Sequence, residues 1–255
     1  MCRLLGTVST IPRTLDDVLG SERAAFLGLA AVHGDGWGHA WSTGVGELEV
    51  RKSPESALTS VELAELAGGR PAEAALTHLR WATLGLSVGP GNTHPFTDGR
   101  IAFAHNGSIA PPAALDDLIV PDVAARRRGD TDSERYFLAL LSRLAEGASP
   151  AEALAATVAG VLAGGAEVHS LNCLLLTPDA LLAVCCYDAE RGADRDYYPL
   201  LHRRTGDTVV VASTGWTDSA GWSTVSNGQM LVVERGTLHT SVVPVGTVEP
   251  VAAVP

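Results

Sequence analysis

The chain carries a thiol at its second position, in the opening stretch MCRLLGTVS. Removal of Met1 would leave Cys2 with a free α-amine beside its own thiol. One residue would then hold a nucleophile and a base, as Thr or Cys at a chain terminus does in some hydrolases. The alternative is an ordinary cysteine placed near the terminus by chance, because the chain contains four. Only a substrate site elsewhere in the chain would distinguish the two.

Three further stretches contain side chains that could form such a site. Arg80, in THLRWATLG, either binds a substrate carboxylate with its guanidinium fork or covers an apolar ring at the surface. Asn106 and Gly107, expected directly after a strand in AHNGSI, form either an oxyanion hole or an ordinary turn. Asp132, in GDTDSER, either binds a substrate ammonium or caps a helix.

Together these groups fit one kind of ligand. A carboxylate partner, an ammonium partner and an oxyanion hole describe an amino acid with an acyl side chain. Cys2 would be the nucleophile that attacks the acyl carbon.

The pattern of apolar residues predicts the elements that must position these groups. We expect strands at 1–9, 47–52, 74–80 and 100–105, helical structure near 15–31, and a helix over 54–69 with Pro54 near its start. A long Gly-rich loop follows residue 80, and its part from Leu84 to Gly99 is a candidate lid.

The second half of the chain predicts two helices followed by strands. The helices cover 130–147, with a capping box of Thr131 and Glu134, and 149–165, with a capping box of Ser149 and Glu152. The strands are expected at 171–177, 180–188, 208–213, 229–236 and 238–244, and residues from about 244 are expected to form a loose tail. The fold class is therefore α+β, with stacked antiparallel sheets and helices outside them.

Composition excludes several classes of protein. The 255 residues carry a net charge of −11, which disfavours nucleic-acid binding and adsorption to anionic membranes. No apolar run approaches the ~18 residues of a membrane span, and no signal-peptide core is evident, so a cytoplasmic protein is expected. The other three cysteines lie in apolar runs and the eight histidines lack metal-ligand spacing, so no metal is expected.

Four ordered motifs resemble those of the class II (N-terminal cysteine) glutamine amidotransferases, a branch of the N-terminal nucleophile hydrolases. They are Met-Cys at the start, RWAT at 80–83, HNG at 105–107 and TDSE at 131–134. The resemblance implies a four-layer αββα sandwich. It also implies a single glutaminase domain over residues 2–243, followed by the tail at 244–255.

The same resemblance implies a role for each matching residue. Cys2 becomes the nucleophile once Met1 is removed, and Asn106 and Gly107 become the oxyanion hole. Arg80 binds the α-carboxylate of glutamine and Asp132 binds its α-amine.

Three more residues lie in segments that match the family. Trp81 and Thr83 belong to the substrate segment, with less definite roles. His94, in GNTHPF, either helps to close the site or is structural.

The implied reaction is hydrolysis of the γ-carboxamide of glutamine, or of a γ-glutamyl amide, through a Cys2 thioester. No phosphate loop or dinucleotide fingerprint is present, so no cofactor is expected. The ammonia either passes to a separate synthase subunit or is released.

Two alternatives stay open. Stand-alone relatives of the ergothioneine pathway are similar in length and motifs, but this chain differs at MCRLLG, where that branch tends to have His after Arg, and at STGWTDSAGW, where relatives often carry Ser-Glu-Pro. The other alternative is an idle glutamine-binding regulatory subunit, which would lack the nucleophile or the oxyanion pair.

Overall fold

Two antiparallel sheets face each other in the computed structural model, which describes residues 2–44, 47–82, 88–190, 196–217 and 221–248. The seven-stranded sheet has the order β11 (Ser223–Val225), β9 (Leu200–Thr205), β10 (Thr208–Ser213), β1 (Arg3–Arg13), β4 (Ala72–Leu79), β2 (Trp37–Gly44) and β3 (Glu47–Ser53). The six-stranded sheet has the order β13 (Thr240–Pro244), β12 (Gln229–Glu234), β8 (Ala180–Cys185), β7 (Glu167–Leu176), β6 (Ala102–Ala110) and β5 (Phe96–Thr97).

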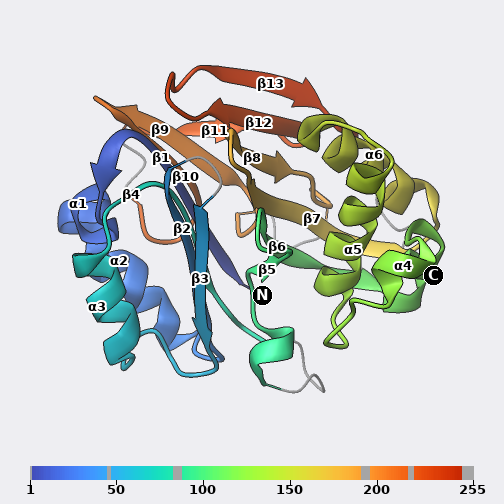
Figure 1. Ribbon diagram of the computed structural model, residues 1–255, viewed down its shortest axis with the longest axis horizontal. Coiled ribbons are helices and arrows are strands. Elements are labelled where there is room, and N and C mark those ends of the chain that lie inside the picture. Colours follow the sequence, from blue (N-terminus) through green and yellow to red (C-terminus); the bar gives the residue numbers. More distant parts are fainter. Residues whose placement is uncertain (1, 45–46, 83–87, 191–195, 218–220, 249–255) are drawn as a thin grey trace.

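Helices cover the outer face of each sheet (Figure 1). The seven-stranded sheet is covered by α1 (Leu15–Leu19), α2 (Arg23–Gly28) and α3 (Val61–Gly69). The six-stranded sheet is covered by α4 (Pro121–Ala124), α5 (Asp132–Ala145) and α6 (Pro150–Ala163). Short 3-10 turns lie between these helices and strands: η1 (Gly20–Glu22), η2 (Leu29–Ala31), η3 (Pro90–Asn92) and η4 (Pro112–Leu118).

Buried apolar side chains fill the spaces between these layers. The cluster between the two sheets joins Leu4, Val8 and Leu76 to Leu174 and Leu181. Separate clusters lie between each sheet and its helices. The expected four-layer αββα sandwich is therefore confirmed.

Strand β1 lies in the interior of its sheet, between β10 and β4. Leu4 and Leu5 are both fully buried, because one face packs on the other sheet and the opposite face on helices. Arg3 pairs with Leu79 of β4, so the start of β1 lies beside the end of β4. This register places Cys2 next to Arg80 and Trp81.

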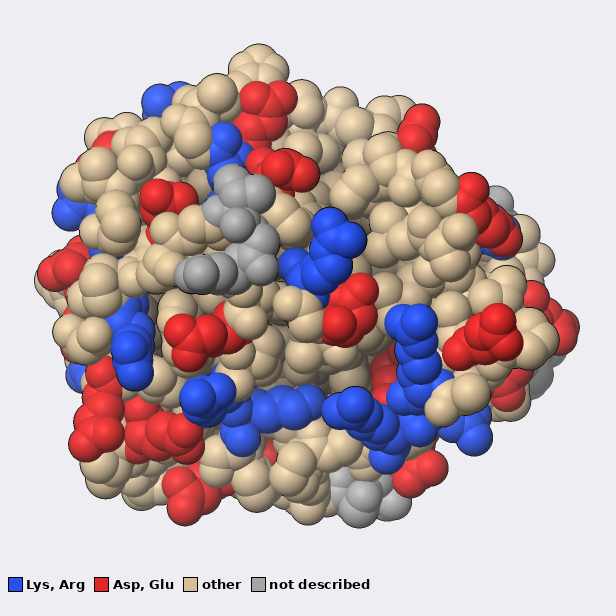
Figure 2. Space-filling model, viewed as in Figure 1, with Lys and Arg blue, Asp and Glu red and all other residues tan. Residues whose placement is uncertain are grey.

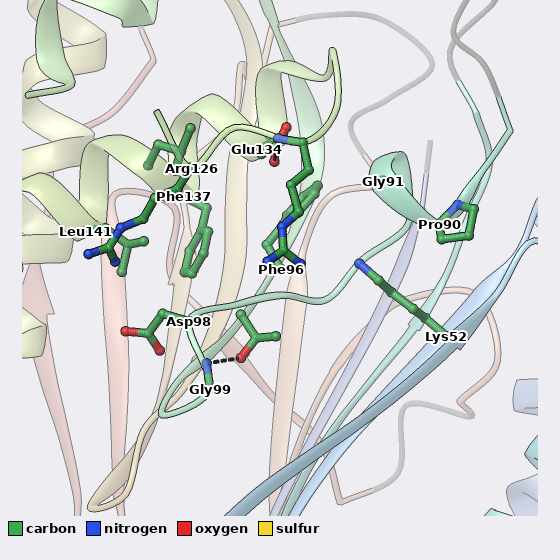
Figure 3. Close-up of a pocket in the computed structure, with 13 residues that line it drawn as sticks. Lys52, Pro90, Gly91, Phe96, Asp98, Gly99, Arg126, Glu134, Phe137 and Leu141 are labelled. Carbon is green, nitrogen blue, oxygen red and sulfur yellow. Dashed lines mark hydrogen bonds between the residues drawn. The ribbon is translucent and has the colours of Figure 1, made fainter. Parts of the chain in front are cut away.

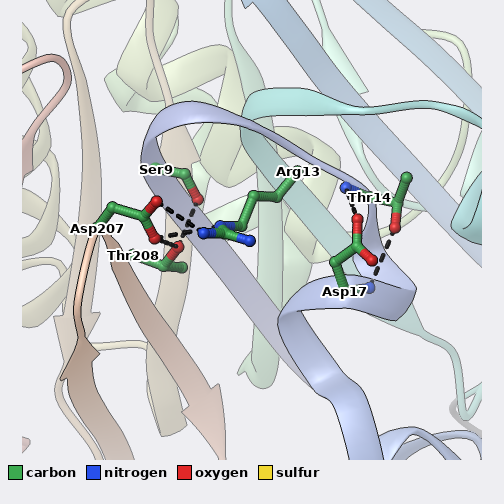
Figure 4. Close-up of polar contacts among 6 residues, drawn as sticks. All are labelled: Ser9, Arg13, Thr14, Asp17, Asp207 and Thr208. Carbon is green, nitrogen blue, oxygen red and sulfur yellow. Dashed lines mark hydrogen bonds and ion pairs between the residues drawn. The ribbon is translucent and has the colours of Figure 1, made fainter.

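The far end of β1 is held by polar contacts (Figure 4). The Arg13 guanidinium contacts both carboxylate oxygens of Asp207, at 3.1 and 2.7 Å. Immediately after it, Thr14 accepts a hydrogen bond from the Asp17 N–H while the Asp17 carboxylate accepts one from the Thr14 N–H. This capping box starts α1 as soon as β1 ends.

The N-termini of α5 and α6 differ. The box of Ser149 and Glu152 on α6 is complete, as predicted. On α5, Thr131 accepts the Glu134 N–H at 3.0 Å, but the predicted reciprocal contact is replaced. The Glu134 carboxylate instead accepts the N–H groups of Arg128 and Gly129, at 2.7 and 2.6 Å.

Several predicted boundaries are wrong. The helix expected from residue 54 begins at Val61 with Ser60 as its cap, and the strand expected over 100–105 continues to Ala110. Strands β9 and β11 were not predicted. β11 is the edge strand of the seven-stranded sheet and β9 lies next to it, and the polar residues of both hide the strand pattern.

The expected loose tail and the candidate lid are both packed where the structure describes them. Val245 and Val248, in the expected tail, are buried in the cluster beneath α5 and α6. Within the expected lid, residues 84–87 lie outside the described residues, but Thr93 and Phe96 are buried. Among the described residues, no helix has the length and apolar character needed to cross a membrane.

Candidate active site

The Cys2 thiol lies against the backbone of the segment that follows β4. Its Sγ accepts the Trp81 N–H at 3.5 Å and lies 3.7 Å from the Trp81 carbonyl oxygen. Cys2 as a whole residue is partly exposed.

Asn106 approaches Cys2 from the opposite sheet. The Cys2 N–H donates to Asn106 Oδ1 at 2.9 Å, although 104 positions separate the two residues. The Asn106 side chain is fully buried, and its Nδ2 has no hydrogen-bond partner among the described residues. An unpaired buried amide is unfavourable by about 1–3 kcal/mol, so a ligand atom that accepted a hydrogen bond from this donor would be stabilising.

Gly107 lies inside β6, not after a strand as the sequence suggested. A Cβ at this position would lie 1.9 Å from the Ser170 carbonyl oxygen and 2.6 Å from His105 Nε2. Only glycine therefore fits between β6 and β7 at this point.

Arg80 and Asp132 provide the two opposite charges of the site. Arg80 is only 3% exposed, and its Nη1 lies 3.5 Å from the Asp35 carbonyl oxygen. Asp132 is the first residue of α5, and its carboxylate accepts the N–H groups of Ile109 and Ser133, both at 2.8 Å. The contact with Ile109 fixes the start of α5 to β6, the strand of the proposed oxyanion hole.

The surroundings of Cys2 act on its thiol in opposite directions. Burial raises its pKa, while the Trp81 N–H and the Arg80 charge lower it and the Asp132 charge raises it. Both charges therefore lie close enough to the sulfur to change its reactivity.

The other predicted residues are placed differently. Trp81 is 43% exposed and its ring meets His33 edge-on at 5.5 Å. Thr83 lies outside the described residues. His94 is buried against His78 and Phe96, at 4.2 and 4.7 Å between ring centroids, and burial keeps its pKa well below the usual range. Of the two roles expected for His94, this position fits the structural one.

Tyr197 is a contact of Cys2 that sequence reasoning missed. Its hydroxyl donates to the Cys2 carbonyl oxygen at 2.9 Å. The Arg3 guanidinium lies 3.7 Å above the Tyr197 ring and donates to the Tyr197 carbonyl at 3.2 Å. No motif marks DYYPLL, and the strand that follows it was itself not predicted.

His105, in the HNG motif, also belongs to this region. Its two ring nitrogens lie 2.9 Å from the Ser133 hydroxyl and 2.9 Å from the Ser170 carbonyl oxygen. The ring thus joins β6, β7 and the first turn of α5 behind the reacting groups.

Comparison with known proteins decides the family of this site. The family model for class II glutamine amidotransferases matches residues 1–252. The chain belongs to the class II glutamine amidotransferases. The resemblance predicted from the four motifs is therefore confirmed, and with it the interpretation of the chain as an enzyme.

Solved structures share the fold of this amidotransferase. A glutamine aminotransferase class-II domain protein from Silicibacter pomeroyi is 22% identical, with a TM-score of 0.68 over 96% of this chain and 100% of its own. Glutamine phosphoribosylpyrophosphate amidotransferase from B. subtilis is 16% identical, with a TM-score of 0.65 over 96% of this chain and 49% of its own.

A curated relative matches over its whole length. The gamma-glutamyl-hercynylcysteine sulfoxide hydrolase of Mycolicibacterium smegmatis is 27% identical over 254 residues, which cover 96% of this chain and 100% of the relative. The similarity between this amidotransferase and a hydrolase of that name therefore covers nearly the whole of both chains.

Proposed function

We propose that this amidotransferase hydrolyses a γ-glutamyl amide through a thioester on Cys2, releasing glutamate and an amine. The observation that carries the proposal is the pairing of Cys2 with Asn106. One amide atom of Asn106 holds the Cys2 nitrogen at 2.9 Å, and the other is a buried donor without a partner in the described part of the chain.

In the proposed first step, the free α-amine of Cys2 accepts the thiol proton and the thiolate attacks the γ-carbonyl carbon. Asn106 Nδ2 and the Gly107 N–H stabilise the oxyanion that forms. The amine then returns its proton to the departing nitrogen as the C–N bond breaks. The thioester remains on Cys2.

Water completes the proposed reaction. The same α-amine removes a proton from the water that attacks the thioester, and glutamate leaves as the C–S bond breaks. Throughout, Arg80 holds the α-carboxylate and Asp132 the α-ammonium of the γ-glutamyl group.

The two candidate substrates differ in their leaving group. The match to a γ-glutamyl hydrolase over that relative's full length favours release of an organic amine. Glutamine, with ammonia passed to a separate synthase subunit, is the second candidate. We also propose that the protein works in the cytoplasm, a reducing compartment in which Cys2 stays free, as all four cysteines are in this structure.

The test is intact mass of the purified protein before and after treatment with 6-diazo-5-oxo-norleucine, a glutamine-like electrophile. We expect loss of Met1 and one adduct. A Cys2→Ala variant should show no adduct, whereas Cys185→Ala should keep it, because burial raises the pKa of the Cys185 thiol to about 11. Retained Met1 without an adduct would contradict the mechanism and favour the idle regulatory subunit.

Activity on a panel of γ-glutamyl amides then separates the two candidate substrates. Faster turnover of an amide with an organic leaving group than of glutamine would support the hydrolase. Faster turnover of glutamine, with free ammonia as product, would support the ammonia-supplying alternative.

A further inference from the structure

A cavity lies between β3, β5 and α5. It has a volume of about 630 Å³ and an apolar floor of Phe96, Phe137, Leu138 and Leu141. Figure 3 shows the Phe96 and Phe137 side chains in this floor, with Lys52 entering from the side of β3. The proposed reaction at Cys2 uses none of these side chains.

Three cationic side chains line the cavity: Lys52, Arg126 and Arg128. The Lys52 ammonium donates to the carbonyl oxygens of Thr93 and Pro95, at 2.7 and 3.3 Å, and lies 5.5 Å from the Phe96 ring centre. Among the described residues, no side chain or carbonyl hydrogen-bonds or pairs with the guanidinium group of Arg126 or Arg128. One ammonium proton and two guanidinium forks are thus left for a ligand.

The two acids of the cavity are engaged with backbone groups. The Asp98 carboxylate accepts the N–H groups of Arg100 and Ile101, at 2.9 and 3.0 Å. Glu134 accepts those of Arg128 and Gly129. Neither acid forms an ion pair with the three cations among the described residues.

Lys52 lies within electrostatic reach of both Glu134 and Arg128. Burial is the main cause that lowers the pKa of Lys52 to about 8; the Glu134 charge raises this pKa, and the smaller effect of the Arg128 charge lowers it. The three cations of the cavity outnumber its two acids in a protein whose net charge is −11. Figure 2 shows Lys and Arg side chains gathered in a band across one face of the molecule.

We propose that this cavity binds an organic anion in which a carboxylate or phosphate group is attached to an apolar, aromatic body. The anionic group lies between Lys52 and Arg128, with Arg126 at the rim, and the body packs on Phe96 and Phe137. A bound anion pairs with the cations and covers the apolar floor.

Calorimetric titration of the wild-type protein tests the site, with phenyl phosphate, benzoate and inorganic phosphate as probes at constant ionic strength. We expect saturable binding of phenyl phosphate or benzoate, and the tighter of the two identifies the anionic group. Inorganic phosphate should bind at least about tenfold more weakly, because it leaves the floor uncovered.

Variants then locate the bound anion. Arg126→Gln and Arg128→Gln change exposed side chains, so both should fold, and Arg128→Gln should weaken binding at least about tenfold. Arg70→Gln, which removes an exposed cation from outside this cavity, should leave the affinity unchanged. The adduct formed on Cys2 should be unaffected in all three variants.

Two results would overturn the proposal. One is the absence of saturable binding of both aromatic anions by the folded wild-type protein. The other is equal affinity in the wild type and in a double variant of Arg126 and Arg128. Inorganic phosphate binding as tightly as phenyl phosphate would overturn the assignment of the apolar floor.

Discussion

The side-chain oxygen and nitrogen of Asn106 have different roles in the proposed reaction. Its oxygen holds the Cys2 nitrogen, and its nitrogen is the buried donor left for the oxyanion. Replacement of Asn106 by Asp keeps an oxygen for the first role and removes the donor needed for the second. We expect kcat to fall by about 10²–10³ with KM little changed, as measured by steady-state kinetics on a γ-glutamyl amide.

Asn227→Asp is the matched control for this change, because Asn227 bonds only to the Tyr187 backbone in the described contacts. Its kcat should stay close to that of the wild type. A fall of less than tenfold in Asn106→Asp would exclude the side chain as an oxyanion donor.

The charges around Cys2 predict the pH dependence of the reaction. Burial raises the pKa of the thiol, so kcat/KM should increase with pH through the neutral range as the thiolate forms. Arg80 lowers that pKa and Asp132 raises it. The ascending limb should therefore move to higher pH in Arg80→Gln and to lower pH in Asp132→Asn.

The position of the limb is measured from pH profiles of kcat/KM. Both variants should also bind substrate more weakly, but the shift of the limb does not depend on that loss. Shifts of the same sign in the two variants would contradict the proposed arrangement of charges.

The residues of the proposed site could be predicted to different extents from the sequence. Cys2, Arg80, Asn106 and Asp132 could be proposed because each has a side chain whose chemistry suits one part of an amino acid. Tyr197 could not, because its contact with Cys2 joins positions 195 residues apart and involves only a backbone oxygen of Cys2. Such a contact leaves no local pattern.

At the scale of elements, close approach of backbones determines where glycine is required. A Cβ on Gly38 of β2 would lie 1.9 Å from the His94 carbonyl oxygen and 2.6 Å from Pro95 Cδ. We expect Gly38→Ala to reduce the free energy of unfolding by about 3 kcal/mol or more, because the clash involves backbone atoms that cannot rotate away. Urea denaturation measures this change.

Gly28→Ala provides the control. This glycine lies at the end of α2 with φ −58°, and a Cβ there would meet nothing within 4 Å. The substitution should raise the free energy of unfolding by up to about 1 kcal/mol, since alanine favours the helix. Equal stability of the two variants would contradict the close approach of β2 to the segment that contains His94.

Element types were easier to predict than element ends. Helices α5 and α6 both have a side-chain cap at their N-terminus, α5 also has a clear apolar face, and both were found close to the expected residues. Strand β6 was predicted too short, because Asn and Gly usually end strands whereas here they continue one that is paired throughout with β7. Pairing with a distant strand overrides the local preference of these two residues.

At the scale of the whole molecule, the proposed site is built across the two sheets. Cys2 precedes β1 of one sheet, and Asn106 belongs to β6 of the other. The apolar cluster between the sheets therefore maintains the contact of 2.9 Å between these residues.

Truncation of a side chain in this cluster should weaken the entire molecule. Leu174 is fully buried between the sheets, and we expect Leu174→Ala to reduce the free energy of unfolding by about 2–5 kcal/mol. Leu58→Ala, at a side chain that is 52% exposed, should change it by less than about 0.5 kcal/mol. Thermal or urea unfolding measures both, and a small effect of Leu174→Ala would mean that the sheets are held by other contacts.

The hydrogen bond between the Cys2 nitrogen and Asn106 has a practical consequence for anyone who purifies the protein. In the proposed mechanism that nitrogen must be a free amine, yet it is already held at the reacting centre by a contact that an amide N–H also makes. Molecules that retain a residue before Cys2 would fold normally but would be catalytically inactive. Specific activity would then report the fraction of molecules trimmed by an aminopeptidase, and an affinity tag would be compatible with turnover only at the other end of the chain.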